Sequence, residues 1–375
     1  QAFVDASGAA GFPRNPDYNN GRPIEGAAPV QLNVNGGRRS STAKEYLRPA
    51  MSRPNLRVET GVAAQRLVIE GGRATGVVVK RGGADAVFRA RRSVVVCAGA
   101  LETPKLLMLS GIGDGAALQA MGIPVAHHSP GVGKNLQDHL IAKLIYRVKP
   151  CGTLNEILTS NLRKAKMGLD YLLRQMGPLA IGAGEANLFA RVTPDAEEAE
   201  VQYLFVNFSS YNYAEGLHRF PGIMINYGTC RPDSRGELSL RSLDPADKPI
   251  IRATYLDHPN DLRLMVEAAK IGRRIATQKP LADLIEEELR PGPAAMTDDA
   301  IIANIRATAS TVFHPCGTAK MGTDAMAVLD PELRVRGVDG LRVADASVFP
   351  LIPSPNIQPA VMMVAERAAA FLRAG

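Results

Sequence analysis

Residues 93–97, with the sequence SVVVC, are apolar at nearly every position. A strand of this composition has both faces buried, as in the interior of an α/β sheet. It leads directly into the small residues 98–100, and Thr103 and Pro104 then have the composition of a helix start, with Thr103 as N-cap. The predicted helix continues to Leu109. A buried strand, a tight turn and a helix form the geometry that brings backbone N–H groups close to a phosphate or a nucleotide.

The last segment, residues 340–373, has a similar plan. A short apolar strand at residues 341–343 leads to Asp345, a proline-rich loop follows, and apolar residues then recur at helical spacing after Asn356. The free N–H groups at the start of a helix favour anions and electron-rich groups. Asn356 lies at that start, where an asparagine is most often a plain N-cap.

His314 lies 42 residues before Asn356 (356 − 314), between Phe313 and Pro315. A single histidine beside an aromatic residue is more often packed in the core than catalytic, so these residues alone leave both interpretations open. Cys316 lies two residues further on, and nothing near it in the sequence marks an activated thiol. We therefore expect Cys316 to be a small buried residue.

Composition excludes several classes of protein. A length of 375 residues favours about two domains, and a hydrophobic content of 46% is enough for a large core. The net charge of +7 is spread along the chain, and aromatic residues make up only 5%, so nucleic-acid binding is not expected. The positive net charge is instead compatible with attraction of an anionic substrate or cofactor.

The four cysteines are far apart and form no C-x-x-C motif, which argues against a zinc site or a disulfide framework. No metal is expected. This cysteine usage fits a reducing compartment, and we expect a cytoplasmic protein. No apolar run has the ~18–20 residues that a membrane span needs. The chain begins with Gln1, so a targeting signal before it stays open.

Regular structure is expected to change along the chain. Residues 1–40 are rich in Gly, Pro and Asn and are predicted to form a long loop, after which Thr42 and Glu45 form a capping box. Short strands follow, and a long helical pattern runs from Thr153 to Met176. Later strands and helices predict an α+β unit on an antiparallel sheet flanked by helices. The predicted boundaries are 1–144 with 336–375 for one domain and 145–335 for the other.

Four stretches together resemble the glucose–methanol–choline (GMC) family of flavin oxidoreductases, in particular its bacterial choline- and alcohol-dehydrogenase branch. They are residues 99–113, similar to the second family signature; 131–139, similar to a loop downstream of it; 313–318, similar to the catalytic-histidine loop; and 345–350 with 354–356, similar to the segment beside the flavin. The match spans nearly the whole chain in the expected order.

The resemblance implies a fold of mixed class, α/β plus α+β. In it, a Rossmann-like FAD-binding domain, 1–144 and 336–375, is interleaved with a substrate-binding domain, 145–335. Family members begin with a βαβ unit whose glycine-rich turn holds the ADP half of FAD. No G-x-G-x-x-G follows a strand in this sequence, so we expect a C-terminal portion that lacks this unit, with an incomplete FAD-binding domain.

The resemblance also implies the chemistry, which is oxidation of a primary alcohol to an aldehyde with FAD as cofactor. His314 corresponds to the base that removes the hydroxyl proton, while the hydride passes to flavin N5. Asn356 corresponds to a second catalytic residue, which hydrogen-bonds the forming alkoxide. The positions expected to contact the cofactor are Ala64, Ala98, Gly99, Asp345, Ala346, Asn356, Ile357 and Gln358. His139, in the loop at 131–139, is expected to be structural.

Three readings stay open. The first is an alcohol dehydrogenase or oxidase whose electron acceptor is a quinone, a carrier protein or oxygen. The second is a hydroxynitrile lyase, because a branch of this fold keeps the flavin without redox chemistry. The third is a non-catalytic interaction module that cannot bind FAD alone. The identity of the alcohol and the oligomeric state do not follow from the sequence.

Overall fold

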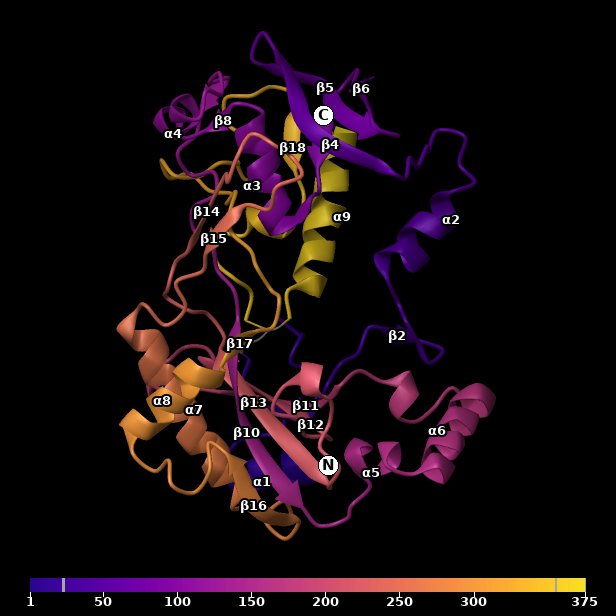
Figure 1. Cartoon of the computed structure of the whole chain (residues 1–375), viewed down its shortest axis with the longest axis vertical. Helices are drawn as coiled ribbons and strands as arrows, with labels where there is room; N and C mark the ends of the chain where they lie inside the picture. The colour runs from indigo at the N-terminus through magenta and orange to yellow at the C-terminus, as the bar shows by residue number, and fades with distance from the viewer. Residues whose placement is uncertain (22–23, 355, 375) are drawn as a thin grey trace. The chain divides into compact units, whose positions relative to one another are not determined.

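The structure is a computed structural model that describes residues 1–21, 24–354 and 356–374. It contains two compact units, each made of three segments of the chain (Figure 1). Unit 1 comprises Gln1–Val58, Leu140–Cys230 and Pro259–Ser310, and unit 2 comprises Glu59–His139, Arg231–His258 and Thr311–Gly375. Interleaving along the chain was predicted, but the boundaries differ from the predicted 1–144, 145–335 and 336–375. For the N-terminal segment the reason is that residues 26–29 pair with a strand of unit 1.

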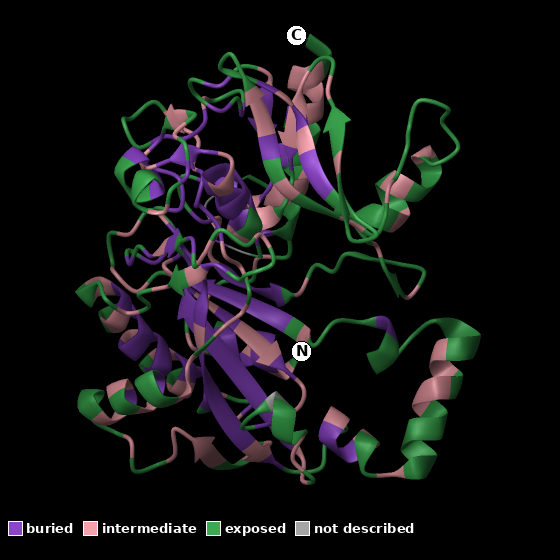
Figure 2. Ribbon diagram, turned by 45° about the horizontal axis from the view of Figure 1, so that its top comes forward, coloured by how far each residue is buried: buried purple, intermediate pink, exposed green. Residues whose placement is uncertain are grey.

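Unit 1 is built on an antiparallel sheet with the strand order β1-β11-β12-β13-β10-β16, and β17 pairs with β10 beside this path. The bounds of its strands are β1 Gly26–Pro29, β10 Leu140–Val148, β11 Gly184–Ala190, β12 Val201–Val206, β13 Gly222–Thr229, β16 Ile285–Arg290 and β17 Ser310–Thr311. Strands β10, β11 and β13 are largely buried, whereas β16 and β17 contain no buried residue and helix α6 is mostly exposed (Figure 2).

Helices and short elements complete unit 1. They are α1 Ala2–Ala9, the hairpin β2 Val34–Asn35 and β3 Arg38–Arg39, the π-helical turn Ala43–Leu47, α2 Arg48–Ala50, α5 Leu154–Leu158, α6 Asn161–Arg174, the 3-10 turns Pro178–Ala180 and Tyr213–Glu215, α7 Pro259–Ala276 and α8 Asp298–Thr308.

Helix α7 covers one face of this sheet. The hydroxyl of Tyr203 on β12 donates to the carbonyl of Ala268 at 2.9 Å, and both residues are buried. Gly272 lets the helix approach, since a Cβ added there would lie 2.6 Å from Leu144 Cδ1. Strand residues alternate between faces. Leu144 and Tyr203 therefore face α7, whereas Ile145 and its neighbours at alternate positions face the other way.

Unit 2 contains a parallel strand pair flanked by two helices. In this pair β7 (Val94–Val96) lies beside β18 (Leu341–Val343), and Val96 pairs with Val343. The other elements are β4 Val62–Glu70, β5 Arg73–Arg81, β6 Ala84–Arg89, α3 Gly99–Leu109, β8 Ile112–Gly113, α4 Gly115–Ala120, β9 His127–His128, β14 Glu237–Ser239, β15 Ile250–Arg252, a 3-10 turn Ala346–Val348 and α9 Gln358–Ala374.

The apolar strand at 93–97 is confirmed as β7, and its residues join one core cluster with those of α3 and β18. The predicted helix start at Thr103 is wrong. Helix α3 begins at Gly99, because the carboxylate of Asp345 at the end of β18 accepts the Gly99 N–H at 2.9 Å. The cap comes from a residue distant in the sequence, which local pattern reading does not detect.

Three further expectations in unit 1 need correction. Residues 1–40 are not a continuous loop: α1 buries Phe3 and Val4, and Phe3 stacks on Phe205 with ring centroids 5.2 Å apart. Thr42 makes no capping bond, and Ser41 Oγ accepts the Lys44 N–H instead. The helical pattern over 153–176 divides into α5 and α6, because Ser160 starts a second helix as its N-cap.

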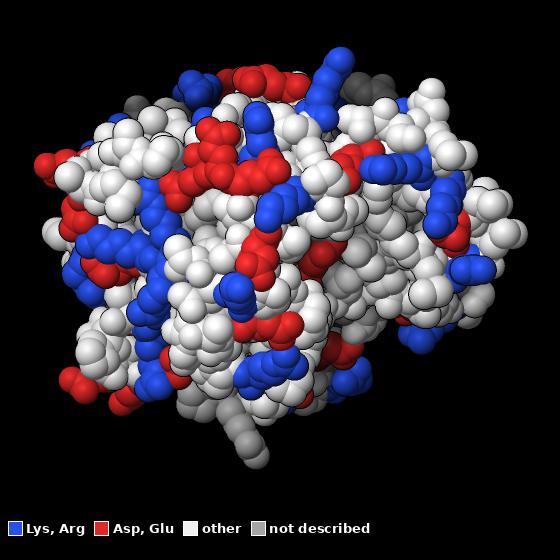
Figure 3. All heavy atoms as spheres, turned by 90° about the horizontal axis from the view of Figure 1, so that it is seen from below, with Lys and Arg blue, Asp and Glu red and all other residues white. Residues whose placement is uncertain are grey.

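A mixed α/β fold with antiparallel sheets is therefore confirmed, while an incomplete Rossmann-like domain stays a prediction. Among the described residues, no helix is both long and apolar enough to span a bilayer. Charged residues of both signs intermingle on the face shown in Figure 3, so the net charge of +7 does not gather there into one uninterrupted patch.

Candidate active site

His314 and Asn356, the two predicted catalytic residues, lie together in unit 2. Asn356 Nδ2 is 3.2 Å from His314 Nε2, although the residues come from different loops. Asn356 is exposed and His314 is half-buried. Solvent or a small ligand can therefore reach the side of the pair where the amide and the imidazole nitrogen meet.

A second histidine contacts the other ring nitrogen. His139 Nδ1 lies 2.9 Å from His314 Nδ1, and the two rings meet edge to face with centroids 5.2 Å apart. His139 is 5% exposed, so this contact is buried. From its loop His139 was expected to be structural, yet the structure places it against the predicted base.

The tautomer of His314 follows from these two contacts. An amide NH₂ group only donates, so His314 Nε2 accepts from Asn356 and carries no proton. The remaining proton of the neutral ring then lies on Nδ1, which donates to His139 Nδ1. This assignment rests on the hydrogen-bond pattern and on the orientation of the amide. It leaves a lone pair on Nε2 beside an N–H donor.

The loop that carries His314 is held by Asp138. The carboxylate of Asp138 accepts the His314 backbone N–H at 2.8 Å, and it also accepts the hydroxyls of Thr311 and Tyr255. Sequence reasoning missed these three partners. The only signal was the position of Asp138 in the stretch at 131–139, because no local pattern shows which residue will receive a backbone N–H 176 positions away.

Phe313, directly before His314, has a φ of 62° although it is bulky, and it is 82% exposed. A bulky residue in this region is strained and persists only where its surroundings enforce it. Here Thr311 Oγ1 accepts the Phe313 N–H at 2.8 Å. The strained residue is therefore the one directly before His314. Its backbone conformation sets the direction in which the His314 side chain leaves the backbone.

Burial lowers the pKa of His314 from its ordinary value, and the negative charge of Asp138 opposes this shift. The imidazole is therefore neutral at pH 7 and able to accept a proton. Cys316 is fully buried, and its pKa is raised to about 12, mainly by burial. It is an inert core thiol, as predicted.

The predicted cofactor residues fall into groups. Gly99 and Asp345 are joined by the hydrogen bond that starts α3, and Thr103 Oγ1 also donates to Asp345 at 2.5 Å. Asp345 is thus 5% exposed and engaged as a helix cap. Asn356 and Gln358 are exposed at the start of α9, whereas Ile357 is buried in the core of unit 2. Ala64 is exposed on β4, and Ala346 is half-buried.

Hydrogen bonds connect the His314 loop to the elements around β7. Thr318 Oγ1 donates to the carbonyl of Ala100 at 2.6 Å, and the Gly317 N–H donates to the carbonyl of Ala346 at 3.1 Å. The segment after His314 is therefore fixed against the first turn of α3 and the Asp345 turn.

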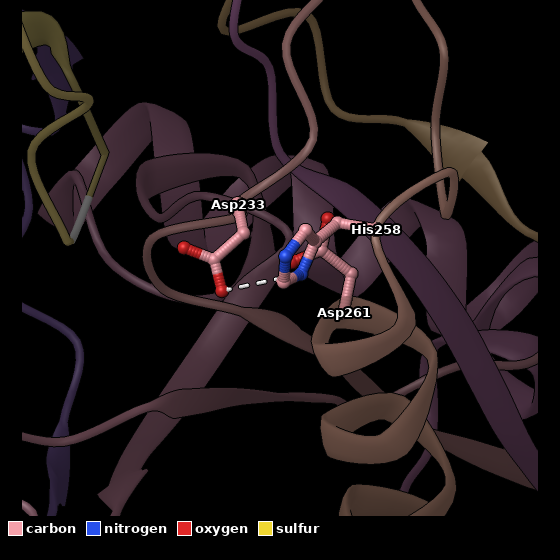
Figure 4. Close-up of side chains that lie close together, drawn as sticks. All are labelled: Asp233, His258 and Asp261. Carbon is pink, nitrogen blue, oxygen red and sulfur yellow. Dashed lines mark ion pairs between the residues drawn. The ribbon is translucent and has the colours of Figure 1, made fainter.

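His258 and Asp233 form another polar pair in unit 2, with Nδ1 and Oδ2 3.6 Å apart (Figure 4). Both side chains are about half exposed. Such a surface pair contributes little unless the imidazole is protonated, and it carries none of the predicted chemistry.

Comparison with known proteins gives the context for this geometry. Two models of the GMC oxidoreductase family match, one over residues 1–141 and the other over residues 232–365. The chain belongs to the GMC oxidoreductase family. It is therefore an oxidoreductase of the flavoprotein class that acts on CH–OH donors. The second family model contains both His314 and Asn356.

Relatives of this GMC oxidoreductase include the oxygen-dependent choline dehydrogenases of Brucella melitensis and Rhizobium johnstonii. Each is 40% identical to this chain. The matches cover 99% and 98% of this chain, respectively, and 67% of each relative. Among solved structures, pyridoxine 4-oxidase from Mesorbium loti is 29% identical with a TM-score of 0.86, and the match covers 100% of this chain and 69% of that one.

A formate oxidase of Aspergillus oryzae RIB40, described for the modification of its FAD, is 27% identical with a TM-score of 0.92. The match covers 99% of this chain and 69% of that one. The N-terminal family model begins at residue 1, so it gives no support to the expectation of a missing N-terminal unit. That expectation stays a prediction.

The residues of this GMC oxidoreductase that surround the end of β7 fit a flavin nucleotide. Ligands of open α/β sheets lie outside the carboxyl ends of parallel strands, and Cys97 and Ala98 emerge exposed from β7 at that end. Gly99 has a φ of +85°, and a Cβ built on it meets no atom within 4 Å. An open, small-residue turn there leaves room for a planar ring or a phosphate close to the backbone.

Proposed function

We propose that this GMC oxidoreductase oxidises a primary alcohol to an aldehyde, with His314 as the group that removes the hydroxyl proton. Its cofactor is FAD, in line with the family and its FAD-containing structural neighbours. When bound, FAD supplies the acceptor for the hydride that leaves the carbinol carbon. The chain's own residues have the remaining tasks of binding, orientation and proton transfer.

The observation that carries this proposal is the contact of His314 Nε2 with Asn356 Nδ2 at 3.2 Å. A substrate hydroxyl that inserts between these atoms donates its proton to Nε2 and accepts the amide N–H on its oxygen. The amide then stabilises the negative charge that develops on that oxygen, without competing for the proton. His139 keeps the opposite ring nitrogen engaged and so supports the tautomer with a free lone pair on Nε2.

Proton transfer turns His314 into an imidazolium ion. The carboxylate of Asp138 lies close enough to raise the pKa of this imidazole, so its charge stabilises the protonated ring. Asp138 does not face the substrate in this proposal. It acts through the loop, by its hydrogen bonds to the His314 N–H, Thr311 and Tyr255.

For cofactor contacts we propose the positions that match the family pattern, which are Ala64, Ala98, Gly99, Asp345, Ala346, Asn356, Ile357 and Gln358. For Asp345 we propose contact through the backbone, because its carboxylate oxygens already accept Gly99 N–H, Thr103 Oγ1 and the Ser347 N–H. The exposed first residues of α9 add N–H donors for a negatively charged reduced ring.

The relatives are named for choline, pyridoxine and formate. Because these names differ, they do not identify the alcohol that this chain oxidises. Quinone, carrier protein and oxygen stay open as electron acceptors, and the term oxygen-dependent belongs to the relatives. Within the described residues all four cysteines are free thiols. This supports a reducing compartment, and we propose the cytoplasm.

Anaerobic reduction of the flavin tests the proposal. The FAD-loaded protein is mixed with a panel of primary alcohols without oxygen, and its visible absorbance is recorded. We expect bleaching of the flavin band and one equivalent of aldehyde. If cyanohydrins are cleaved while the flavin band persists, the protein is a lyase. If no alcohol bleaches the flavin and no cyanohydrin is cleaved, the non-catalytic reading holds.

A further inference from the structure

Helix α6 of unit 1 carries a stripe of apolar residues that is turned to solvent. The residues of the stripe recur at helical spacing and are Leu162, Ala165, Leu169, Leu172 and Leu173. Leu162 is 81% exposed, Leu172 77% and Leu173 73%. All 14 residues of α6 are described, and none of them is buried. A surface helix normally buries such a stripe against its own core, so this stripe lacks the cover that its pattern predicts.

The fold holds α6 in this orientation. Met167 and Tyr171 lie on the side of the helix opposite the leucines, and both are half-buried. The helix has defined ends, because Ser160 Oγ accepts the Arg163 N–H at 3.4 Å and Gln175 ends it in the left-handed conformation. Unit 1 therefore presents the leucines outward and keeps the other side of the helix partly covered.

Two neighbouring segments extend the exposed apolar area. A Cβ added at Gly37, in the β2–β3 hairpin, would lie 2.8 Å from Gln175 Cβ at the end of α6. A Cβ added at Gly182 would lie 3.4 Å from Leu32 Cδ2, just before the hairpin. Leu32 is 40% exposed, and Leu179 in the turn after α6 is 51% exposed. Helix α6, the turn Pro178–Ala180 and residues 32–39 together are called the α6 surface below.

Cations outnumber acids on the α6 surface. The charged residues of the helix itself are one acid, Asp170, and four cations, Arg163, Lys164, Lys166 and Arg174. Arg163 lies 3.5 Å from the carboxylate of Glu156. Within the part of the chain that the structure describes, no ion pair engages the other three cations of α6. The exposed strand β3, Arg38–Arg39, adds two more positive charges.

We propose that the α6 surface docks on an anionic lipid bilayer. In this arrangement the leucines insert among the lipid head groups and the basic side chains meet the phosphates. A helix with leucines on one side and Lys and Arg on the other lies in the plane of the membrane interface, with its apolar side buried. The long stems of Lys164 and Lys166 let their charged ends reach the phosphates. The cytoplasmic leaflet is negatively charged, which agrees with the cytoplasmic location proposed above.

Charge favours a bilayer over a second copy of this chain as the occupant. In a symmetric dimer the same surface patch meets itself. The cations of one α6 would then approach those of its partner, and only one acid on each helix, Asp170, would offset them. Like charges brought together at an interface are unfavourable. An anionic bilayer offers both an apolar interior for the leucines and opposite charge for the cations.

Binding to vesicles tests the proposal. The 375-residue chain is mixed with vesicles of phosphatidylglycerol and phosphatidylcholine in equal parts, or of phosphatidylcholine alone, and the bound fraction is measured by flotation. We expect binding to the anionic vesicles to be about 10-fold or more stronger, because each basic residue at an anionic surface adds several-fold. Leu172→Glu should weaken this binding about 10-fold or more. Met296→Glu, at a 70% exposed residue before α8, should leave it unchanged.

The electrostatic part has its own variants. Lys164→Gln combined with Lys166→Gln should weaken binding to the anionic vesicles about 10-fold or more and leave binding to phosphatidylcholine unchanged. The matched control is Lys279→Gln, whose side chain is 82% exposed and pairs with Asp283. Added salt should weaken the binding of the wild-type chain.

A fluorescence experiment gives a readout that does not depend on loss of binding. The chain contains no tryptophan, so a single introduced one reports its own surroundings. Leu172→Trp keeps a large apolar side chain on the stripe. Its emission should shift to shorter wavelength when anionic vesicles are added, because the indole enters the interface. The emission of Met296→Trp should not shift.

The outcomes separate the occupants. Equal binding of wild type and Leu172→Glu to anionic vesicles, or no binding by the wild type, overturns the proposal. A dimer that Leu172→Glu converts into a monomer, without any vesicle binding, also overturns it and identifies a second copy as the occupant. Vesicle binding is measured without FAD or alcohol, so either result leaves the proposed function unaffected.

Discussion

Three contacts hold His314 in one orientation. A general base needs this, because its lone pair must point at the proton that it accepts. Asp138 holds its backbone N–H, His139 engages Nδ1, and Asn356 meets Nε2. Positioning groups of this kind reduce the reorganisation needed when a proton moves. The exposed, positive-φ Phe313 before it shows that the loop accepts backbone strain to keep this direction.

Replacement of His314 by alanine should lower kcat/KM for alcohol oxidation by ~10²–10⁴-fold, the range for loss of a general base. Flavin absorbance should be retained. The control is His258→Ala, which removes an exposed imidazole from a surface ion pair and should leave the rate unchanged. Wild-type turnover in His314→Ala with flavin bound would exclude His314 as the base.

The pH dependence should reflect the buried imidazole. Activity needs the neutral ring, so kcat/KM should rise with pH and level off, and its midpoint should lie below 6.5, because burial lowers the pKa of His314. Asp138 raises this pKa, so Asp138→Asn, which keeps an acceptor for the His314 N–H, should move the midpoint to still lower pH. A shift to higher pH in this variant would contradict the assigned electrostatics.

Among the elements, α3 depends most clearly on a residue far away in the chain. Its first N–H group, on Gly99, donates to Asp345, and Thr103 in the second turn donates to the same carboxylate oxygen. The other oxygen of Asp345 accepts the Ser347 N–H at 2.8 Å. One carboxylate thus ties the start of α3 to the turn that follows β18.

Asp345→Asn should lower the free energy of unfolding of unit 2 by about 1–3 kcal/mol, because an amide NH₂ would face donors that now share a carboxylate oxygen. Urea denaturation followed by circular dichroism measures this change. The matched control is Asp244→Asn, an exposed residue that accepts the Ala246 N–H in a turn, where a loss below about 0.5 kcal/mol is expected. Equal losses in both variants would show that Asp345 is no special cap.

Elements with a strong local pattern were predictable from the sequence. The apolar strand at 93–97 lies where the pattern puts it, as β7. Strand β10 was not predicted because Lys143 and Arg147 interrupt its apolar run. The free-energy cost of placing these charged residues in a strand is offset by tertiary contacts, which the local sequence does not show. The catalytic pair was recognised by resemblance, whereas its supports, Asp138 and Tyr255, depend on contacts that local spacing does not encode.

At the scale of the whole molecule, cofactor retention is the property most open to direct test. The 375-residue chain should be colourless after purification, because its sequence has no G-x-G-x-x-G turn and a few backbone contacts around Gly99 do not replace a phosphate-binding turn. Gel filtration without added FAD, followed by an absorbance spectrum, measures this, whereas the flavin-reduction assays described above are run with FAD supplied in excess. A yellow peak with one flavin per chain would refute the expectation.

The bond between Gly99 and Asp345 joins residues 246 positions apart. A ribosome adding ~5–20 residues per second needs on the order of 12–50 s to make the intervening chain. Throughout that interval β7 has no β18 beside it, whereas every strand of the unit 1 sheet is made before β18. Unit 2 is thus completed last. Its early segments need shielding from aggregation during synthesis, so slower translation or scarce chaperones should reduce the yield of unit 2 before that of unit 1.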